Sequence, residues 1–158
     1  MGAEAPSYRV PWLVIGIGNP LRGDDGVGAL LAERVGGRCV HQLTPELAAE
    51  LALLQRVLFI DAWLVPGQAD DAPPSRPRLD PIAPEVPGDG CGTSHHLDPA
   101  QLLAITAALY GRAPSAALLR VPAYGFAHGS PLSAPLLASL PAARDLLQQW
   151  LESPAAAA

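Results

Sequence analysis

The sequence contains no lysine, and it has little of the chemistry that marks several large classes of protein. All 10 basic residues are arginines, and against 15 acidic residues they leave a formal net charge of −5. The arginines form no basic cluster. Proteins that bind nucleic acid usually carry a basic patch, so we do not expect nucleic acid as a partner.

Cysteine and long apolar runs are also scarce. Only Cys39 and Cys91 are present, outside any C-x-x-C pair, so the chain has no disulfide framework and suits a reduced, intracellular setting. The first nine residues show no basic segment followed by an apolar core. No apolar run reaches the roughly 18 residues that a membrane helix needs. We therefore expect a cytoplasmic protein with no membrane partner.

The composition is that of an ordinary globular domain. Hydrophobic residues make up 49% of the 158 residues and charged residues 16%. Apolar strand-like runs alternate with helical patterns, which predicts an α/β fold in one domain, 1–158, with 1–9 and 154–158 frayed. We expect a mainly parallel twisted sheet with helices on both faces. The expected strands are 12–17, 39–44, 56–62, 78–82 at an edge and 116–122, and the expected helices begin near 25, 45, 99 and 133.

A glycine-rich loop joins the first strand to the first helix, and it carries two adjacent carboxylates. Its start fits a dinucleotide fingerprint until Leu21, which stands where the third glycine belongs. It also fits a phosphate loop until Asp24 and Asp25, which stand where Lys-Ser/Thr is required. Two carboxylates repel a phosphate, so they indicate a site for a cation or a proton. One of them can cap the helix, but a cap needs only one.

Further candidate ligands follow later in the chain. Asp61 ends an apolar strand, and ligands in open α/β sheets bind beyond the carboxyl ends of strands. If the first and third strands are neighbours, Asp61 shares a crevice with the loop carboxylates. His95 and His96 lie in a loop before a helix whose N-cap is Asp98. Oxygen and nitrogen donors of this kind suit zinc, iron, nickel or manganese, and no H-E-x-x-H motif selects zinc.

The loop sequence, Gly16-Ile-Gly-Asn-Pro-Leu-Arg-Gly-Asp-Asp-Gly-Val-Gly28, closely resembles the opening motif of the hydrogenase maturation proteases. These endopeptidases trim the C-terminus of nickel-iron hydrogenase large subunits. The resemblance covers almost the whole chain. Its other segments are Ile60-Asp61, Thr93-Ser94-His95 before a helix, and Ser130-Pro-Leu-Ser133 before the last helix.

The resemblance implies a metal-contacting set of Asp25, Asp61 and His95. Some relatives have Glu where this chain has Asp25, and the adjacent His96 leaves the histidine ligand open. The implied substrate is a nickel-iron hydrogenase large subunit precursor whose nickel is already inserted. The resemblance implies that the enzyme reads this nickel and cuts just beyond the last metal-binding cysteine motif. Nickel is then carried by the substrate, and we expect the resting enzyme to hold no tightly bound metal.

Two mechanisms are compatible with the candidate catalytic residues, Asp24, Asp25 and Asp61. A carboxylate can activate water while the metal polarises the peptide carbonyl, or the carboxylates can act alone while the metal serves only for recognition. The alternative function is a small-molecule or nucleotide-binding α/β domain without proteolytic activity. The glycine-rich loop favours that alternative, whereas the paired aspartates disfavour it.

Overall fold

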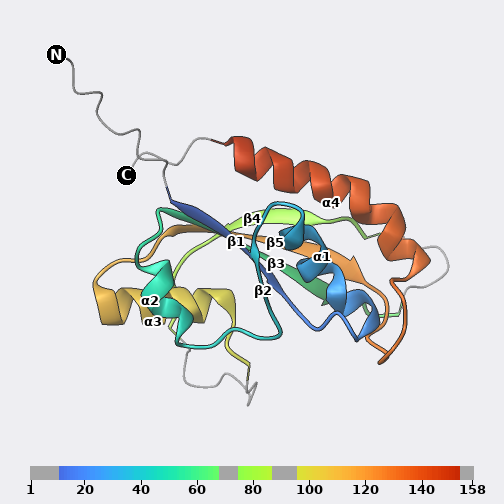
Figure 1. Ribbon diagram of the computed structural model, residues 1–158, viewed down its shortest axis with the longest axis horizontal. Coiled ribbons are helices and arrows are strands. Elements are labelled where there is room, and N and C mark those ends of the chain that lie inside the picture. Colours follow the sequence, from blue (N-terminus) through green and yellow to red (C-terminus); the bar gives the residue numbers. More distant parts are fainter. Residues whose placement is uncertain (1–10, 68–74, 87–95, 154–158) are drawn as a thin grey trace.

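The computed structural model describes residues 11–67, 75–86 and 96–153, which form one α/β domain (Figure 1). The predicted frayed ends, 1–9 and 154–158, lie outside the described residues. The helices and strands, in chain order, are β1 (Trp12–Ile17), the 3₁₀ helix η1 (Gly23–Gly26), α1 (Val27–Glu33), β2 (Arg38–Val40), α2 (Leu47–Leu51), β3 (Arg56–Leu64), β4 (Arg78–Ile82), α3 (Pro99–Tyr110), β5 (Ser115–Ala123) and α4 (Ala134–Glu152).

The five strands form a single sheet in the order β2-β1-β3-β5-β4. Neighbouring pairs among β2, β1, β3 and β5 are parallel, and β4 is antiparallel to β5 at one edge. This arrangement confirms the predicted α/β class and the mainly parallel sheet. The edge strand has the predicted bounds, 78–82, and its one proline, Pro81, is tolerated because an edge strand needs fewer ladder donors.

Two elements are shorter than the sequence predicts. β2 ends at Val40, and Leu43 forms an isolated bridge with Leu97. α2 covers only five residues, because its flanks form tighter i→i+3 turns; Ala48 N–H donates to Pro45 O, for example. The strong capping box at Asp98 and Gln101, in contrast, starts α3 where the sequence predicts.

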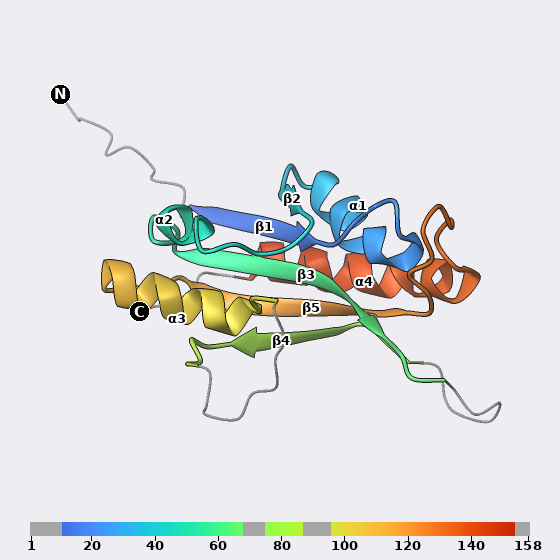
Figure 2. The same ribbon diagram turned by 90° about the horizontal axis from the view of Figure 1, so that it is seen from below.

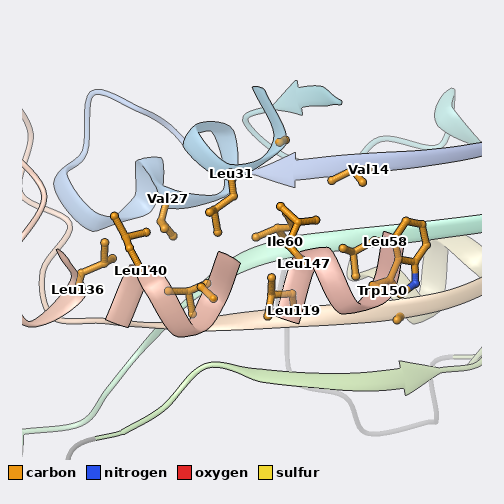
Figure 3. Close-up of a cluster of buried hydrophobic side chains, with 14 residues drawn as sticks. Val14, Val27, Leu31, Leu58, Ile60, Leu119, Leu136, Leu140, Leu147 and Trp150 are labelled. Atoms are coloured by element: carbon orange, nitrogen blue, oxygen red, sulfur yellow. The ribbon is translucent and has the colours of Figure 1, made fainter. Parts of the chain in front are cut away.

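Helices cover both faces of the sheet, as predicted. Figure 2 shows α4 behind the strands and α3 in front of them. The buried side chains of α1 and α4 pack on one face, and Figure 3 shows these side chains converging on the strands. This cluster includes Val14, Val27, Leu31, Leu58, Ile60, Leu119, Leu136, Leu140, Leu147 and Trp150.

The opposite face is covered by α2 and α3. Their contributions to that cluster include Leu47, Leu51, Leu102 and Leu103, which pack against strand residues such as Phe59. Because side chains alternate along a strand, β3 sends Phe59 to this face and Ile60 to the other. In the described part of the chain, no helix is long and apolar enough to cross a bilayer.

Glycine brings α1 unusually close to the sheet. A Cβ on Gly28 would lie 2.6 Å from Ile17 O and 2.8 Å from Ile60 O, and one on Gly16 would lie 2.1 Å from Gly28 O. No larger residue fits this backbone contact. The first turn of α1 therefore sits directly on β1 and β3, which fixes the preceding loop at their carboxyl ends.

Candidate functional site

The candidate site lies at the end of β1, beside Asp61 of β3, which continues to Leu64 instead of ending near Asp61 as the sequence predicts. The two strands are neighbours, and their register runs from Trp12↔Arg56 to Gly16↔Ile60. The next residue of β3 is Asp61, so its carboxylate lies beside the end of β1. The condition set by the sequence, that the first and third strands be adjacent, is met.

Asp25 is placed at the end of β1 by the glycine-rich loop. Its Oδ2 accepts a hydrogen bond from the Asn19 backbone N–H at 2.8 Å. Gly18 has φ 130°, and a Cβ there would lie 2.1 Å from Asp25 O and 2.9 Å from Asp25 Oδ1. Only glycine tolerates both the dihedral and the close contact. The loop thus holds Asp25 against the turn that follows β1.

The Asp25 charge acts on Asp61. Burial, and then the neighbouring Asp25 carboxylate, raise the pKa of Asp61 to about 6, although the Ala62 N–H and Arg120 oppose the shift. Arg120 is the register partner of Asp61 on β5. Two carboxylates in a partly desolvated place favour either a shared proton or a bound cation. A carboxyl with a pKa near neutrality also suits general acid-base chemistry.

Asp24 has a different environment from Asp25, although the two are adjacent in sequence. It is only 1% exposed, and its carboxylate accepts from Tyr124 N–H at 2.8 Å, Ser133 N–H at 2.7 Å and Ser133 Oγ at 2.7 Å. Its own N–H donates to Gly125 O at 3.1 Å. These contacts tie η1 to the loop after β5 and to the start of α4. They indicate a structural role, and the catalytic role suggested by the sequence stays a prediction.

Neither aspartate caps the helix that follows it, so that expectation was wrong. Neither η1 nor α1 has a side-chain cap, whereas the Ser133 side chain caps α4 by accepting from Leu136 N–H. Asp24 orients this capping hydroxyl from about a hundred residues away in the sequence. No local pattern in the sequence marks Tyr124 as an Asp24 donor, and Ser133 is marked only by the family resemblance.

The predicted histidine ligand, His95, lies outside the described residues. The chain that follows it can be placed: Leu97 bridges Leu43 beyond the end of β2 and packs in the cluster beneath α3. Asp61 is two residues after Phe59 and therefore points to that same face of the sheet. Within the described ranges, no three His, Cys, Asp or Glu side chains come together as a cation site. Two of the three predicted ligands, Asp25 and Asp61, are brought together.

No protein-family model matches the chain, and no curated protein matches it by sequence. Solved structures do match. The [NiFe] hydrogenase maturation protease HycI from Thermococcus kodakarensis is 20% identical, with a TM-score of 0.64 over 93% of this chain and 96% of that one. The hydrogenase maturating endopeptidase HybD from E. coli is 18% identical, with a TM-score of 0.64 over 89% and 91% of the two chains.

A hydrogenase 2 maturation peptidase from a Thaumarchaeota archaeon is also similar. It is 21% identical, with a TM-score of 0.59 over 90% of this chain and 98% of that one. In each case the match spans nearly the full length of both chains. The chain therefore has the fold of the hydrogenase maturation proteases.

Proposed function

We propose that this protein is an endopeptidase that removes the C-terminal extension of a nickel-iron hydrogenase large subunit precursor after nickel insertion. The observation that carries the proposal is the Asp25–Asp61 pair, placed at the carboxyl ends of neighbouring strands in a maturation-protease fold. The reaction would take place in the cytoplasm. The nickel belongs to the substrate.

Asp25, Asp61 and His95 would contact that nickel. Carboxylates and imidazole are suitable ligands for divalent nickel. A divalent cation also offsets the repulsion that raises the Asp61 pKa, so the pair gains most from a substrate that brings its own metal. A precursor without nickel lacks this anchor, and the enzyme would thereby select the assembled substrate.

Among Asp24, Asp25 and Asp61, Asp61 is also the strongest candidate for general acid-base catalysis of the hydrolysis. With a pKa of about 6, it can take a proton from water and return it near neutral pH. Whether the nickel also polarises the scissile carbonyl separates the two mechanisms that the residues allow.

The proposal is tested by cleavage of nickel-loaded and nickel-free precursors, measured by the mass of the released tail. We expect cleavage of the loaded form only, with His95→Ala reducing it at least a hundredfold. His41→Ala is a matched control, because His41 is exposed and is not one of the implied nickel ligands. His96→Ala tests the neighbouring histidine. Equal cleavage of both precursors would contradict nickel reading, and no cleavage of any precursor would favour the non-proteolytic binding domain.

A further inference from the structure

The distal half of β3 has one open side. Its pairing with β5 continues to Leu64↔Ala123, whereas its pairing with β1 stops at Gly16↔Ile60. Figure 2 shows the end of β3 extending past the end of β1. The last four residues of β3 therefore have a strand neighbour on the β5 side but none on the β1 side.

Hydrogen bonds at both ends of β3 show which backbone groups face the open side. Val65 N–H donates to Ala123 O at 2.9 Å, and Gln55 O accepts from Ser115 N–H at 2.9 Å. Odd-numbered residues therefore point to β5, and even-numbered residues point to the β1 side, because these directions alternate along a strand. Ala62 and Leu64 consequently face the open side, where no described backbone group forms a hydrogen bond with them. The Ala62 N–H donates to the Asp61 carboxylate, so the groups left for an added strand are the Ala62 C=O and the Leu64 N–H and C=O.

Beyond the end of β1, the backbone leaves the side of β3 at the turn formed by Gly18. Gly18 N–H donates to Val40 O at 2.9 Å, so the backbone turns toward β2 after β1 ends. Asp25 lies against that turn, and Asp61 immediately precedes Ala62. A strand added at the usual spacing of about 4.8 Å from β3 would continue the line of β1 and pass beside both carboxylates.

Exposed apolar side chains accompany this edge. Trp63 is 45% exposed and Leu64 50% exposed, although both belong to a strand whose first five residues are buried. Trp63 lies two residues after Asp61 and so projects to the same face of the sheet. Large apolar side chains at an open edge are available to contact the side chains of an added strand.

We propose that the precursor binds by strand addition: an extended segment around its scissile bond pairs with the backbone of Ala62 and Leu64, as a sixth strand that continues β1. This inference rests on the proposed function and specifies how the substrate is bound. Main-chain hydrogen bonds would hold the segment independently of its sequence. The metal contacts at Asp25 and Asp61 would then decide which precursor is cut.

The test removes one backbone donor at a time by proline substitution. Ala62→Pro and Leu64→Pro each delete an N–H on the open side and leave the β5 ladder intact, which an edge tolerates. Ala62→Pro also removes the N–H that interacts with the Asp61 carboxylate, so Leu64→Pro is the variant that tests the edge alone. The matched control is Cys39→Pro on the other edge of the sheet. Val40 O faces β1, so the Cys39 N–H points away from it.

We expect both β3 variants to raise KM for the nickel-loaded precursor at least tenfold with melting temperatures near that of the wild type, and Cys39→Pro to leave KM unchanged. Leu64→Pro is the decisive variant, because Ala62→Pro also changes the environment of Asp61. A wild-type KM in Leu64→Pro would overturn strand addition while leaving the protease intact. A wild-type enzyme that cleaves no precursor would overturn the proposed function, and this inference with it.

Discussion

The charged residues in the first and second halves of β3 have opposite environments. At its start, the buried Arg56 donates to Ser153 O at 2.7 Å and to Trp150 O, and its guanidinium stacks 4.1 Å from the centre of the Trp150 ring. At its other end, Asp61 meets a second carboxylate, and its pKa rises to about 6. A charge whose partners are supplied by the fold is structural. Two neighbouring like charges, only partly offset by Arg120 and by single backbone N–H groups, indicate a ligand site.

The same contrast separates Asp24 from Asp25. Asp24 is buried and accepts three hydrogen bonds from two distant segments, whereas Asp25 accepts one from the adjacent turn. Asp24 and Asp25 therefore have different roles, although they are adjacent in the sequence. One joins parts of the fold, and the other is left with acceptor capacity at the end of β1.

The largest expected effect is on activity. Asp25→Asn is expected to reduce cleavage of a nickel-loaded precursor at least a hundredfold, because it removes one of the two charges proposed to contact the nickel. The melting temperature should stay within a few degrees of wild type, since only one backbone hydrogen bond to the side chain is affected. Mass spectrometry of the released tail and thermal unfolding measure the two quantities. Normal cleavage would remove Asp25 from the site.

At the other end of β3, Arg56→Met is expected to lower the free energy of unfolding by about 3 kcal/mol. It leaves the carbonyls of Trp150 and Ser153 without their charged donor and removes the ring contact. Urea unfolding measures the loss. Cleavage per folded molecule should not change; a specific loss of activity would show that the two ends of β3 are not separate in function.

Asp24→Asn is expected to lower the free energy of unfolding by about 2 kcal/mol, because the amide cannot accept from all three donors. We expect turnover per folded molecule within about threefold of wild type, in contrast to Asp25→Asn. Ser133→Ala is a matched variant, because it removes one of those donors and the α4 cap together. Loss of turnover without loss of stability would instead support a direct catalytic role for Asp24.

Asp61 is expected to make stability depend on pH. The folded protein keeps its proton up to about pH 6, whereas an unfolded Asp loses it near its ordinary pKa of about 3.9. The free energy of unfolding should therefore fall by about 2 kcal/mol as the pH rises from about 4 to 7. Asp61→Asn should remove this part of the pH dependence and be more stable than wild type at pH 7. Urea unfolding across this pH range measures the effect. If the pKa of Asp61 is not raised, the free energies of unfolding of wild type and Asp61→Asn would change in parallel with pH.

Local signals in the sequence predicted some elements closely. The capping box at Asp98 placed the start of α3, and proline in 78–82 identified the edge strand. The bounds of β2 and α2 were less predictable, because Leu43 pairs with Leu97 across the fold and tight turns flank α2. Such tertiary contacts leave no periodic pattern in the local sequence.

For the site, the sequence by itself determined that two carboxylates follow the first strand and that Asp61 ends the apolar run of the third, because such runs are local features. The adjacent Asp24 and Asp25 also disfavoured phosphate binding in the glycine-rich loop. Only the tertiary structure decided that the two strands are neighbours, so that Asp25 acts on Asp61.

The tertiary structure also separated the two adjacent aspartates. The Asp24 carboxylate accepts hydrogen bonds from Tyr124 and Ser133, which lie about a hundred residues away in the sequence. The open edge at Ala62 and Leu64 arises because β3 is longer than β1 and the chain turns away at Gly18. Strand order, relative strand length and long-range hydrogen bonds depend on how the whole chain packs, so the residue pattern alone could not specify them.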